Sequence, residues 1–144
     1  MLTFVDLDVS RAWTAYRRLR LVVDAEVARD LERSTALSMP DFEVLAAVVE
    51  LDEPCLRVAA LAGHLGWSHS RLSRQLGRME TRGLIDRVPC ERDGRGDDVV
   101  LGPEGRSAYD AAEPVHATAV TRHFGDRLAH EDLATLIALG SRLE

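Results

Sequence analysis

Apolar side chains recur every three or four residues along much of this chain, the spacing that places them on one face of an α-helix. The first such stretch covers about residues 9–33 and is marked by Trp13, Tyr16, Leu19, Val23, Val27 and Leu31. A second stretch follows Ser38-Met-Pro-Asp41, which combines a capping serine with a proline in the first turn. The pattern therefore predicts a long first helix and a second helix after residue 38.

Two shorter helices are predicted around a glycine in the middle of the chain. The first covers about Val58–Leu65 and ends at Gly66. The second follows at once, with Ser68 as its N-cap and Gly83 at its end. A short helix, a tight turn and a second helix make up a helix-turn-helix unit, whose second helix fits the major groove of DNA.

The pattern then changes to a predicted β-hairpin. Residues 84–88 and 98–101 are short β-prone pieces on either side of a polar, glycine-rich tip at residues 93–97. We therefore expect a mainly α-helical fold with one small hairpin, which would be the wing of a winged helix-turn-helix.

Helical spacing returns in the last third of the chain. Gly102-Pro103 opens a predicted fifth helix that reaches about Phe124, where Gly125 interrupts it. A sixth helix is predicted over about residues 130–143. With six helices predicted, most of the chain is α-helical.

Composition narrows the classes of function. The 144 residues are 46% hydrophobic, enough for one domain with a proper core. All 18 basic residues are arginines, so lysine Schiff-base chemistry and the lysine phosphate-binding loop are excluded. No group of residues is spaced along the chain like a known catalytic motif. We therefore expect that the protein is not an enzyme and uses no cofactor. A small enzyme whose catalytic residues come together only on folding stays an alternative.

Several features favour the cytoplasm. No apolar run approaches the roughly 20 residues that cross a bilayer, so we expect no membrane partner. The first ten residues carry Asp6 and Asp8, where a secretory signal would be basic and apolar. Cys55 and Cys90 lie 35 positions apart with no C-x-x-C motif, as is typical of a reducing compartment.

Charge is unevenly distributed. The chain carries a net charge of -6, but residues 65–95 hold seven arginines and four acidic residues, a net +3, which leaves -9 for the remainder. A basic third on an acidic body is compatible with a nucleic-acid partner despite the negative total.

The helix after Ser68 concentrates this basic charge on one face. At 100° per residue its polar members fall within an arc of about 100°. They are Arg71, Arg74, Gln75, Arg78 and Arg82. The apolar residues Leu72, Leu76 and Met79 form a separate stripe that can pack against a core. A solvated surface helix with an arginine face is the alternative explanation of this pattern.

Three of these polar side chains are expected to read bases. Arginine bonds bidentately to guanine and glutamine to adenine, so Arg71, Arg74 and Gln75 are the candidates.

Four further side chains are expected on the DNA backbone. Ser68 and Ser70 lie at the helix N-terminus, where hydroxyls and free N–H groups meet phosphate. Arg78 and Arg82, further along, are expected to touch phosphates as well.

Three segments give a specific resemblance. They are Leu61-Ala-Gly-His-Leu-Gly-Trp-Ser-His-Ser-Arg-Leu-Ser-Arg-Gln-Leu-Gly-Arg-Met-Glu-Thr-Arg-Gly-Leu-Ile85, Arg92-Asp-Gly-Arg-Gly96 and Leu101-Gly-Pro-Glu-Gly-Arg106. Together they resemble the MarR family of winged-helix transcriptional regulators. The resemblance implies that Arg95 reaches into a minor groove and that Asp93 holds it in place. The chain departs from the family at Gly102 and Ala129, where a Thr or Ser usually caps the fifth and sixth helices.

The resemblance further implies a homodimer in which the first, fifth and sixth helices of two subunits interlock. Apolar positions near both chain ends point the same way, because they exceed what a small winged helix can cover. They include Trp13, Tyr16, Val23, Val27, Val115, Val120, Phe124, Leu133, Leu136 and Ile137. Within one compact domain we expect dimerisation helices at residues 1–37 and 103–144, and the DNA-binding region at residues 38–102.

The resemblance also implies a crevice for a small aromatic or phenolic anion. Trp13, Arg17 and His116 are candidates because they offer an aromatic face or positive charge, although dimer core or solvated surface is the alternative for each. His116, His123 and His130 are seven residues apart, about 10 Å along a helix, so we expect no metal site.

The two cysteines are expected to be structural thiols. A redox switch is the alternative, and Cys90 is then the stronger candidate because neighbouring arginines favour a thiolate.

Taken together, the sequence predicts a homodimeric, sequence-specific DNA-binding transcriptional regulator. We expect a ligand-responsive repressor that recognises a short inverted repeat, with its two recognition helices about 34 Å apart. The alternative is a winged-helix module that binds another protein and not DNA.

Overall fold

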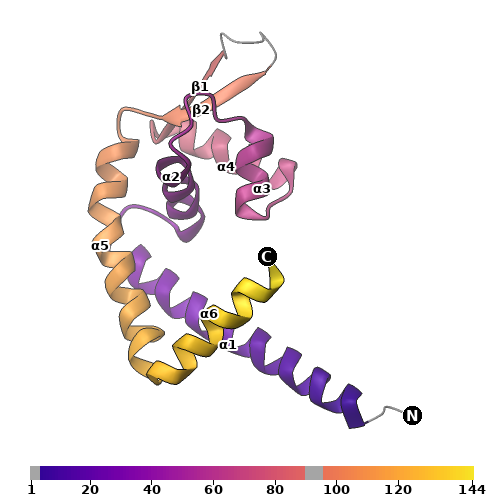
Figure 1. The fold of residues 1–144 in the computed structure, drawn as a ribbon. Helices are drawn as coiled ribbons and strands as arrows, with labels where there is room; N and C mark the ends of the chain where they lie inside the picture. The colour runs from indigo at the N-terminus through magenta and orange to yellow at the C-terminus, as the bar shows by residue number, and fades with distance from the viewer. Residues whose placement is uncertain (1–3, 90–95) are drawn as a thin grey trace. The chain divides into compact units, whose positions relative to one another are not determined.

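The computed structural model describes residues 4–89 and 96–144 and confirms a mainly helical fold with one hairpin (Figure 1). The order of elements is α1 (Phe4–Ser34), α2 (Met39–Leu51), α3 (Val58–Leu65), α4 (His69–Thr81), β1 (Ile85–Pro89), β2 (Asp97–Leu101), α5 (Gly105–His123), the short 3-10 helix η1 (Gly125–Arg127) and α6 (His130–Leu143). The chain groups into two compact units, each described by itself below: residues 31–114, the winged unit, and residues up to 30 with 115–144, the helical unit. The functional division at residues 37 and 102 stays a prediction.

The winged unit is built around the apolar stripe predicted for α4. Leu72, Leu76 and Met79 are fully buried, together with Leu45 of α2 and Leu61 of α3. β1 and β2 pair antiparallel, contact α2, α3 and α4, and run out from one end of the unit (Figure 1). Burial of this stripe fixes which face of α4 remains for solvent.

The second helix begins as its residues predict. The Ser38 side chain accepts a hydrogen bond from Asp41 N at 3.3 Å, and Asp41 Oδ2 accepts one from Ser38 N at 2.9 Å. This reciprocal capping box satisfies two N–H groups that the first turn would otherwise leave without partners.

α5 begins at Gly105, three residues later than the position of Gly102 suggested. Gly102 N donates to Leu84 O at 2.9 Å, and a Cβ added to Gly102 would lie 2.2 Å from Gly83 O. A Cβ at Gly105 would lie 2.0 Å from Leu84 O. These glycines therefore permit close backbone packing against the start of the hairpin, which explains why residue 102 is not a capping Ser or Thr.

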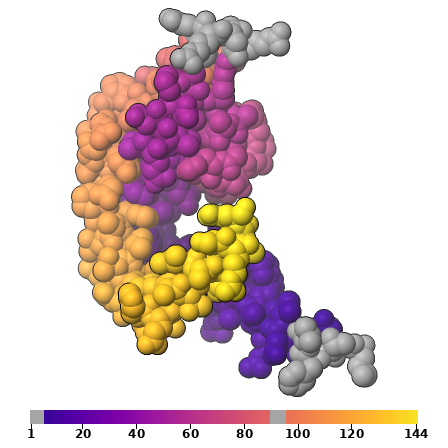
Figure 2. Space-filling model, viewed as in Figure 1, coloured from indigo at the N-terminus to yellow at the C-terminus, as the bar shows by residue number. Residues whose placement is uncertain are grey.

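The helical unit consists of most of α1, the last part of α5, η1 and α6. Asp30 of α1 holds the end of α5, because its Oδ2 lies 2.7 Å from His123 Nε2 and 3.2 Å from Arg122 Nη1. No residue of α6 is buried, and the space-filling view shows this helix with a broad solvent-facing surface (Figure 2).

Large apolar side chains stand exposed on both α1 and α6. They are Leu7, Val9, Trp13, Tyr16, Leu19, Leu21, Val22, Leu136, Ile137, Leu139 and Leu143. Even so, no helix in the described part of the chain is long and apolar enough to span a bilayer.

Candidate nucleic-acid interface

Three residues join α3 to α4 in a tight turn. Gly66 has a left-handed backbone with φ 65°, and its N–H caps the end of α3. A side chain would be strained in this conformation, so glycine is required there. Ser68 is the N-cap of α4, and its Oγ accepts a hydrogen bond from Arg71 N at 3.2 Å. The predicted helix-turn-helix is thus confirmed.

The first turns of α4 present two arginines to solvent. The Arg71 guanidinium carbon lies 3.8 Å from the centroid of the Trp67 ring, a cation–π contact that orients the side chain. Arg74 is exposed and makes no hydrogen bond or ion pair with any residue that the structure describes. Ser70 is also exposed, with its Oγ 3.5 Å from Ser68 Oγ. The structure therefore brings these four side chains to one exposed end of the helix.

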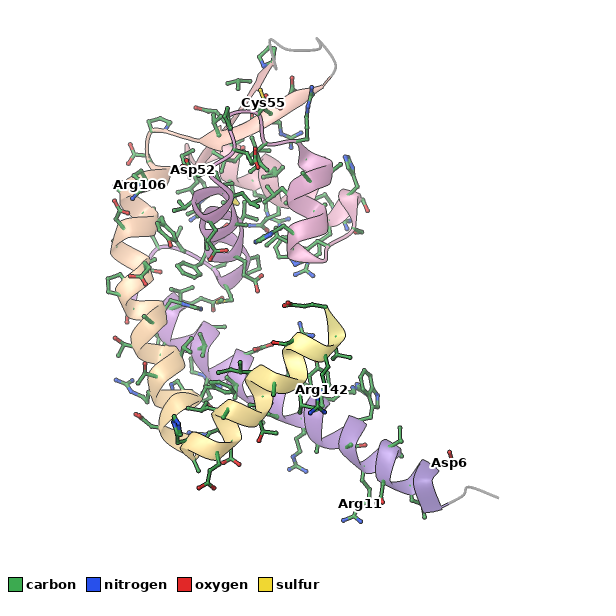
Figure 3. The ribbon with its side chains drawn as sticks, in the orientation of Figure 1. Asp6, Arg11, Asp52, Cys55, Arg106 and Arg142 are labelled. Carbon is green, nitrogen blue, oxygen red and sulfur yellow. The ribbon has the colours of Figure 1, made fainter. Side chains whose placement is uncertain are left out.

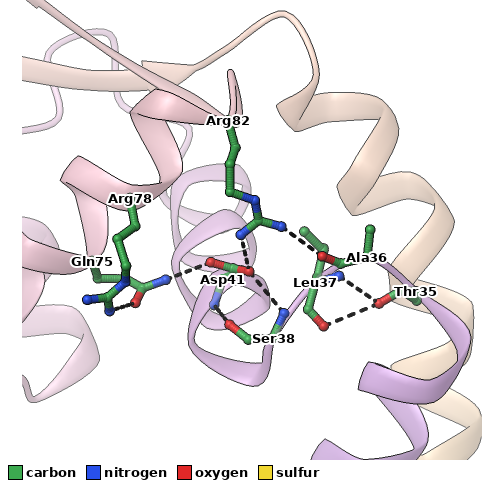
Figure 4. Close-up of polar contacts among 8 residues, drawn as sticks. All are labelled: Thr35, Ala36, Leu37, Ser38, Asp41, Gln75, Arg78 and Arg82. Carbon is green, nitrogen blue, oxygen red and sulfur yellow. Dashed lines mark hydrogen bonds and ion pairs between the residues drawn. The ribbon is translucent and has the colours of Figure 1, made fainter.

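Gln75 is placed differently from the other candidates. Its side chain is only 3% exposed, and its Nε2 donates to Asp41 Oδ1 at 2.7 Å (Figure 4). Its Oε1 accepts a hydrogen bond from Arg78 Nη2. The amide is therefore bonded within the protein, although helical periodicity places Gln75 on the same face as the solvent-facing arginines.

Arg82 is likewise engaged within the protein. Its Nη1 donates to Asp41 Oδ2 and its Nη2 to Ala36 O, both at 2.7 Å (Figure 4). As the C-cap residue of α4 it lies where the helix faces the start of α2. The four arginines predicted on one face of α4 therefore differ in their surroundings. Arg71 and Arg74 are exposed, Arg78 is bonded to Gln75, and Arg82 is bonded to α2 and the segment before it.

Asp41 is the functional candidate that the sequence analysis missed. Burial alone would raise the pKa of this carboxyl, but the Arg82 guanidinium and the Ser38 N–H outweigh it and hold the pKa below its ordinary value. The carboxylate form is therefore the one that binds α4. The only local signal was its place in the capping box.

The hairpin is fastened to α4 by a further arginine. Arg87 Nη2 donates to Ser73 O at 3.1 Å, and its Nε lies 3.6 Å from Glu80 Oε2. On the other strand, buried Asp98 pairs with Arg57 before α3, at 3.4 Å. These contacts hold the base of the wing beside α4.

A depression opens between the start of α3, α4 and the two strands. It is lined by Arg57, Val58, Ala59, His69, Ser73, Arg87, Gly96 and Asp97. Asp93 and Arg95, the predicted wing pair, and Cys90 lie outside the described residues, so their roles stay predictions. Cys55 is a half-buried thiol in the loop after α2, near the hairpin (Figure 3).

The ligand candidates of the helical unit are only partly brought together. Trp13 and Arg17 line a shallow depression with Tyr16, Arg20, Leu21 and Asp24, all of α1. The Trp13 and Tyr16 ring centroids are 5.6 Å apart. His116 is on α5 and does not line this depression. Among the residues with described side chains, no three His, Cys, Asp or Glu form a cluster that could hold a metal ion.

Comparison with known proteins gives a consistent result. A MarR family model matches residues 37–96. The transcriptional regulator HosA of Escherichia coli O157:H7 is 30% identical over 125 residues, which cover 87% of this chain and 90% of that protein. The crystal structure of AbsC, a MarR family transcriptional regulator from Streptomyces coelicolor, is 33% identical and covers 100% of this chain and 99% of that one, with a TM-score of 0.81.

A second solved structure adds a nucleic acid. Sco3205, a MarR family transcriptional regulator from Streptomyces coelicolor, was crystallised in complex with DNA. It is 27% identical, with a TM-score of 0.83 over 99% of this chain and 91% of that one. The winged helix-turn-helix and these relatives agree, and the chain belongs to the MarR family of transcriptional regulators, which bind DNA and are not enzymes.

Proposed function

We propose that the protein is a homodimeric regulator that binds a specific inverted repeat in duplex DNA through α4. The observation that carries this proposal is the exposed arginine-bearing start of α4, set between a tight glycine turn and a hairpin. In helix-turn-helix proteins this second helix enters the major groove. The similar protein Sco3205 was solved in complex with DNA, which supports DNA as the partner.

The side chains of α4 divide by role under this proposal. Arg71 and Arg74 read base edges, and guanine is the partner that their bidentate geometry favours. Ser68 and Ser70 bind a phosphate at the helix N-terminus, and Arg78 adds a backbone contact. Gln75 and Arg82, expected at first among the DNA contacts, are assigned instead to bonds within the protein. Arg95 enters a minor groove with Asp93 beside it, as the family resemblance implies.

The exposed apolar side chains of α1 and α6 supply the dimer interface. A monomer rarely leaves so many large apolar groups in water, and a two-fold axis buries the same surface on both subunits. Two α4 helices related by that axis and about 34 Å apart meet successive turns of the major groove, which requires an inverted repeat.

Regulation is proposed to respond to a small aromatic anion. The Trp13 and Tyr16 rings and the Arg17 guanidinium offer stacking and charge along α1, and His116 is a further candidate on α5. The protein is proposed to repress its target genes, with binding of the ligand releasing it from DNA. The cytoplasm is its proposed location.

Selection of bound duplexes from a random pool tests the proposal. We expect an inverted repeat whose half-site centres are about 10 base pairs apart, with affinity that falls steeply as salt rises. Repeating the selection with millimolar benzoate should reduce recovery of that motif. Enrichment of no motif would contradict DNA recognition and favour the alternative, a winged helix that binds another protein.

A further inference from the structure

Asp41 connects the start of α2 to two positions of the recognition helix. The carboxylate is 3% exposed, and its Oδ1 accepts from Gln75 Nε2 at 2.7 Å. Its Oδ2 accepts from Ser38 N at 2.9 Å and from Arg82 Nη1 at 2.7 Å. Residues 75 and 82 are seven apart, about two turns, so one carboxylate fixes both the rotation and the tilt of α4.

The segment that receives Arg82 is itself ordered by hydrogen bonds. Thr35 Oγ1 donates to Leu31 O at 2.9 Å. The same Oγ1 accepts from Leu37 N at 3.1 Å (Figure 4). Ala36 O, between these contacts, accepts Arg82 Nη2. The guanidinium therefore bridges two fixed acceptors, and leaving them for a phosphate would break both bonds.

The same carboxylate acts on Arg78 through Gln75. With its amide nitrogen on Asp41, Gln75 turns its Oε1 outward to accept from Arg78 Nη2. Moving Gln75 to an adenine would take one donor from the buried Asp41 carboxylate and break the bond to Arg78, a loss comparable with what one base contact supplies.

We propose that Asp41 is a positioning residue for DNA recognition, which keeps Gln75 and Arg82 off the DNA and sets the orientation of Arg78. Sequence preference on α4 is then read by Arg71 and Arg74. The inference rests on the proposed function, because it requires that α4 reads DNA.

Asp41→Asn is the direct test. An asparagine side chain offers one acceptor oxygen, so it cannot accept from both Gln75 and Arg82 as the carboxylate does. The matched control is Asp110→Asn, which makes the same charge change at an exposed carboxylate of α5 that pairs with Arg106. Random-pool selection and salt titrations are run on both variants and on the wild type, with circular dichroism to verify folding.

We expect the control to select the wild-type motif. The Asp41→Asn variant should bind that motif about tenfold less tightly and select a relaxed motif. Its plot of log affinity against log salt should steepen by about one, because a released arginine can neutralise one more phosphate. A folded Asp41→Asn variant with the wild-type motif and salt slope would overturn the inference.

The variant Gln75→Met tests whether Gln75 reads a base, and it does so even if Asp41→Asn fails to fold. Methionine fits a buried site of similar size but cannot bond to Asp41 or to a base. We expect weaker binding with every base preference retained. Loss of preference at a single A·T pair would show that Gln75 reads adenine and would overturn the inference. If the wild type enriches no motif, the proposed function itself fails, and this inference fails with it.

Discussion

Arg74 is the side chain on which the residue-scale account of DNA binding depends most. It is exposed, and no residue that the structure describes pairs with it or holds it back from a base. Arg74→Ala should weaken specific binding by about 1–3 kcal/mol and relax preference at one base pair. Arg106→Ala, which removes an exposed arginine of α5, is the control and should change affinity little. Fluorescence anisotropy titration measures the affinity of both variants for DNA. Equal affinities for the two variants would contradict the proposed position of the DNA interface.

Stability against acid should depend on Asp41. Its pKa is lowered in the folded protein, so its contribution is present above the ordinary carboxyl value and is lost as the pH falls through the folded pKa. We expect Asp41→Asn to cost about 1–3 kcal/mol at pH 7. In urea unfolding at a fixed protein concentration, the gap from wild type should shrink below pH 4 or so. A gap that stays constant with pH would contradict an ionised Asp41 in the fold.

Local signals predicted the elements well where their causes are local. Gly66 and Ser68 define the turn and the start of α4 by their own backbone and side-chain chemistry, and both lie as expected. The partner of Gln75 is Asp41, 34 residues earlier, which helical periodicity cannot reveal. Gly102 is likewise constrained by a distant residue, because it packs against the backbone of Gly83 at the other end of the hairpin. The predicted start of α5 at Gly102 was therefore three residues early.

At the scale of elements, the start of α5 depends on Gly102. A Cβ there would meet the backbone oxygen of Gly83, which has no flexible side chain to yield. Gly102→Ala should destabilise the fold by about 1–3 kcal/mol or more. Gly63→Ala in α3 is the matched control, because its Cβ would meet nothing within 4 Å. That control should be neutral or stabilise by up to about 1 kcal/mol in thermal unfolding.

The N-terminus of α6 offers the opposite case, a stabilising change. Ala129 has the extended backbone of an N-cap, with φ -70° and ψ 158°, and its N–H already donates to Asp132 Oδ2 at 2.9 Å. Ala129→Ser would add the missing acceptor and should stabilise the protein by about 1 kcal/mol. Chemical denaturation measures the change. Ala129→Val, which has no acceptor, should not reproduce it.

At the scale of the whole molecule, charge and assembly act together. The net +3 of residues 65–95 stands against -9 elsewhere, so phosphate is attracted to the recognition helix and repelled by the body. Single α4 surfaces with a few arginines bind weakly, and two of them on one axis gain from their linkage. Specific binding should therefore require the dimer.

A substitution at Ile137 of α6 tests whether specific binding requires the dimer. Ile137 is 72% exposed, so replacing it should change the folding stability of a single subunit little. Ile137→Asp should leave each subunit folded but bury a charge in the dimer interface, so sedimentation should shift from dimer to monomer. Affinity for the inverted repeat should fall at least tenfold, while affinity for a single half-site changes little. Ala60→Glu, which adds a charge at an exposed position of α3 outside the predicted dimerisation helices, should keep the dimer. A dimeric Ile137→Asp with wild-type affinity would mean that the subunits meet through another surface.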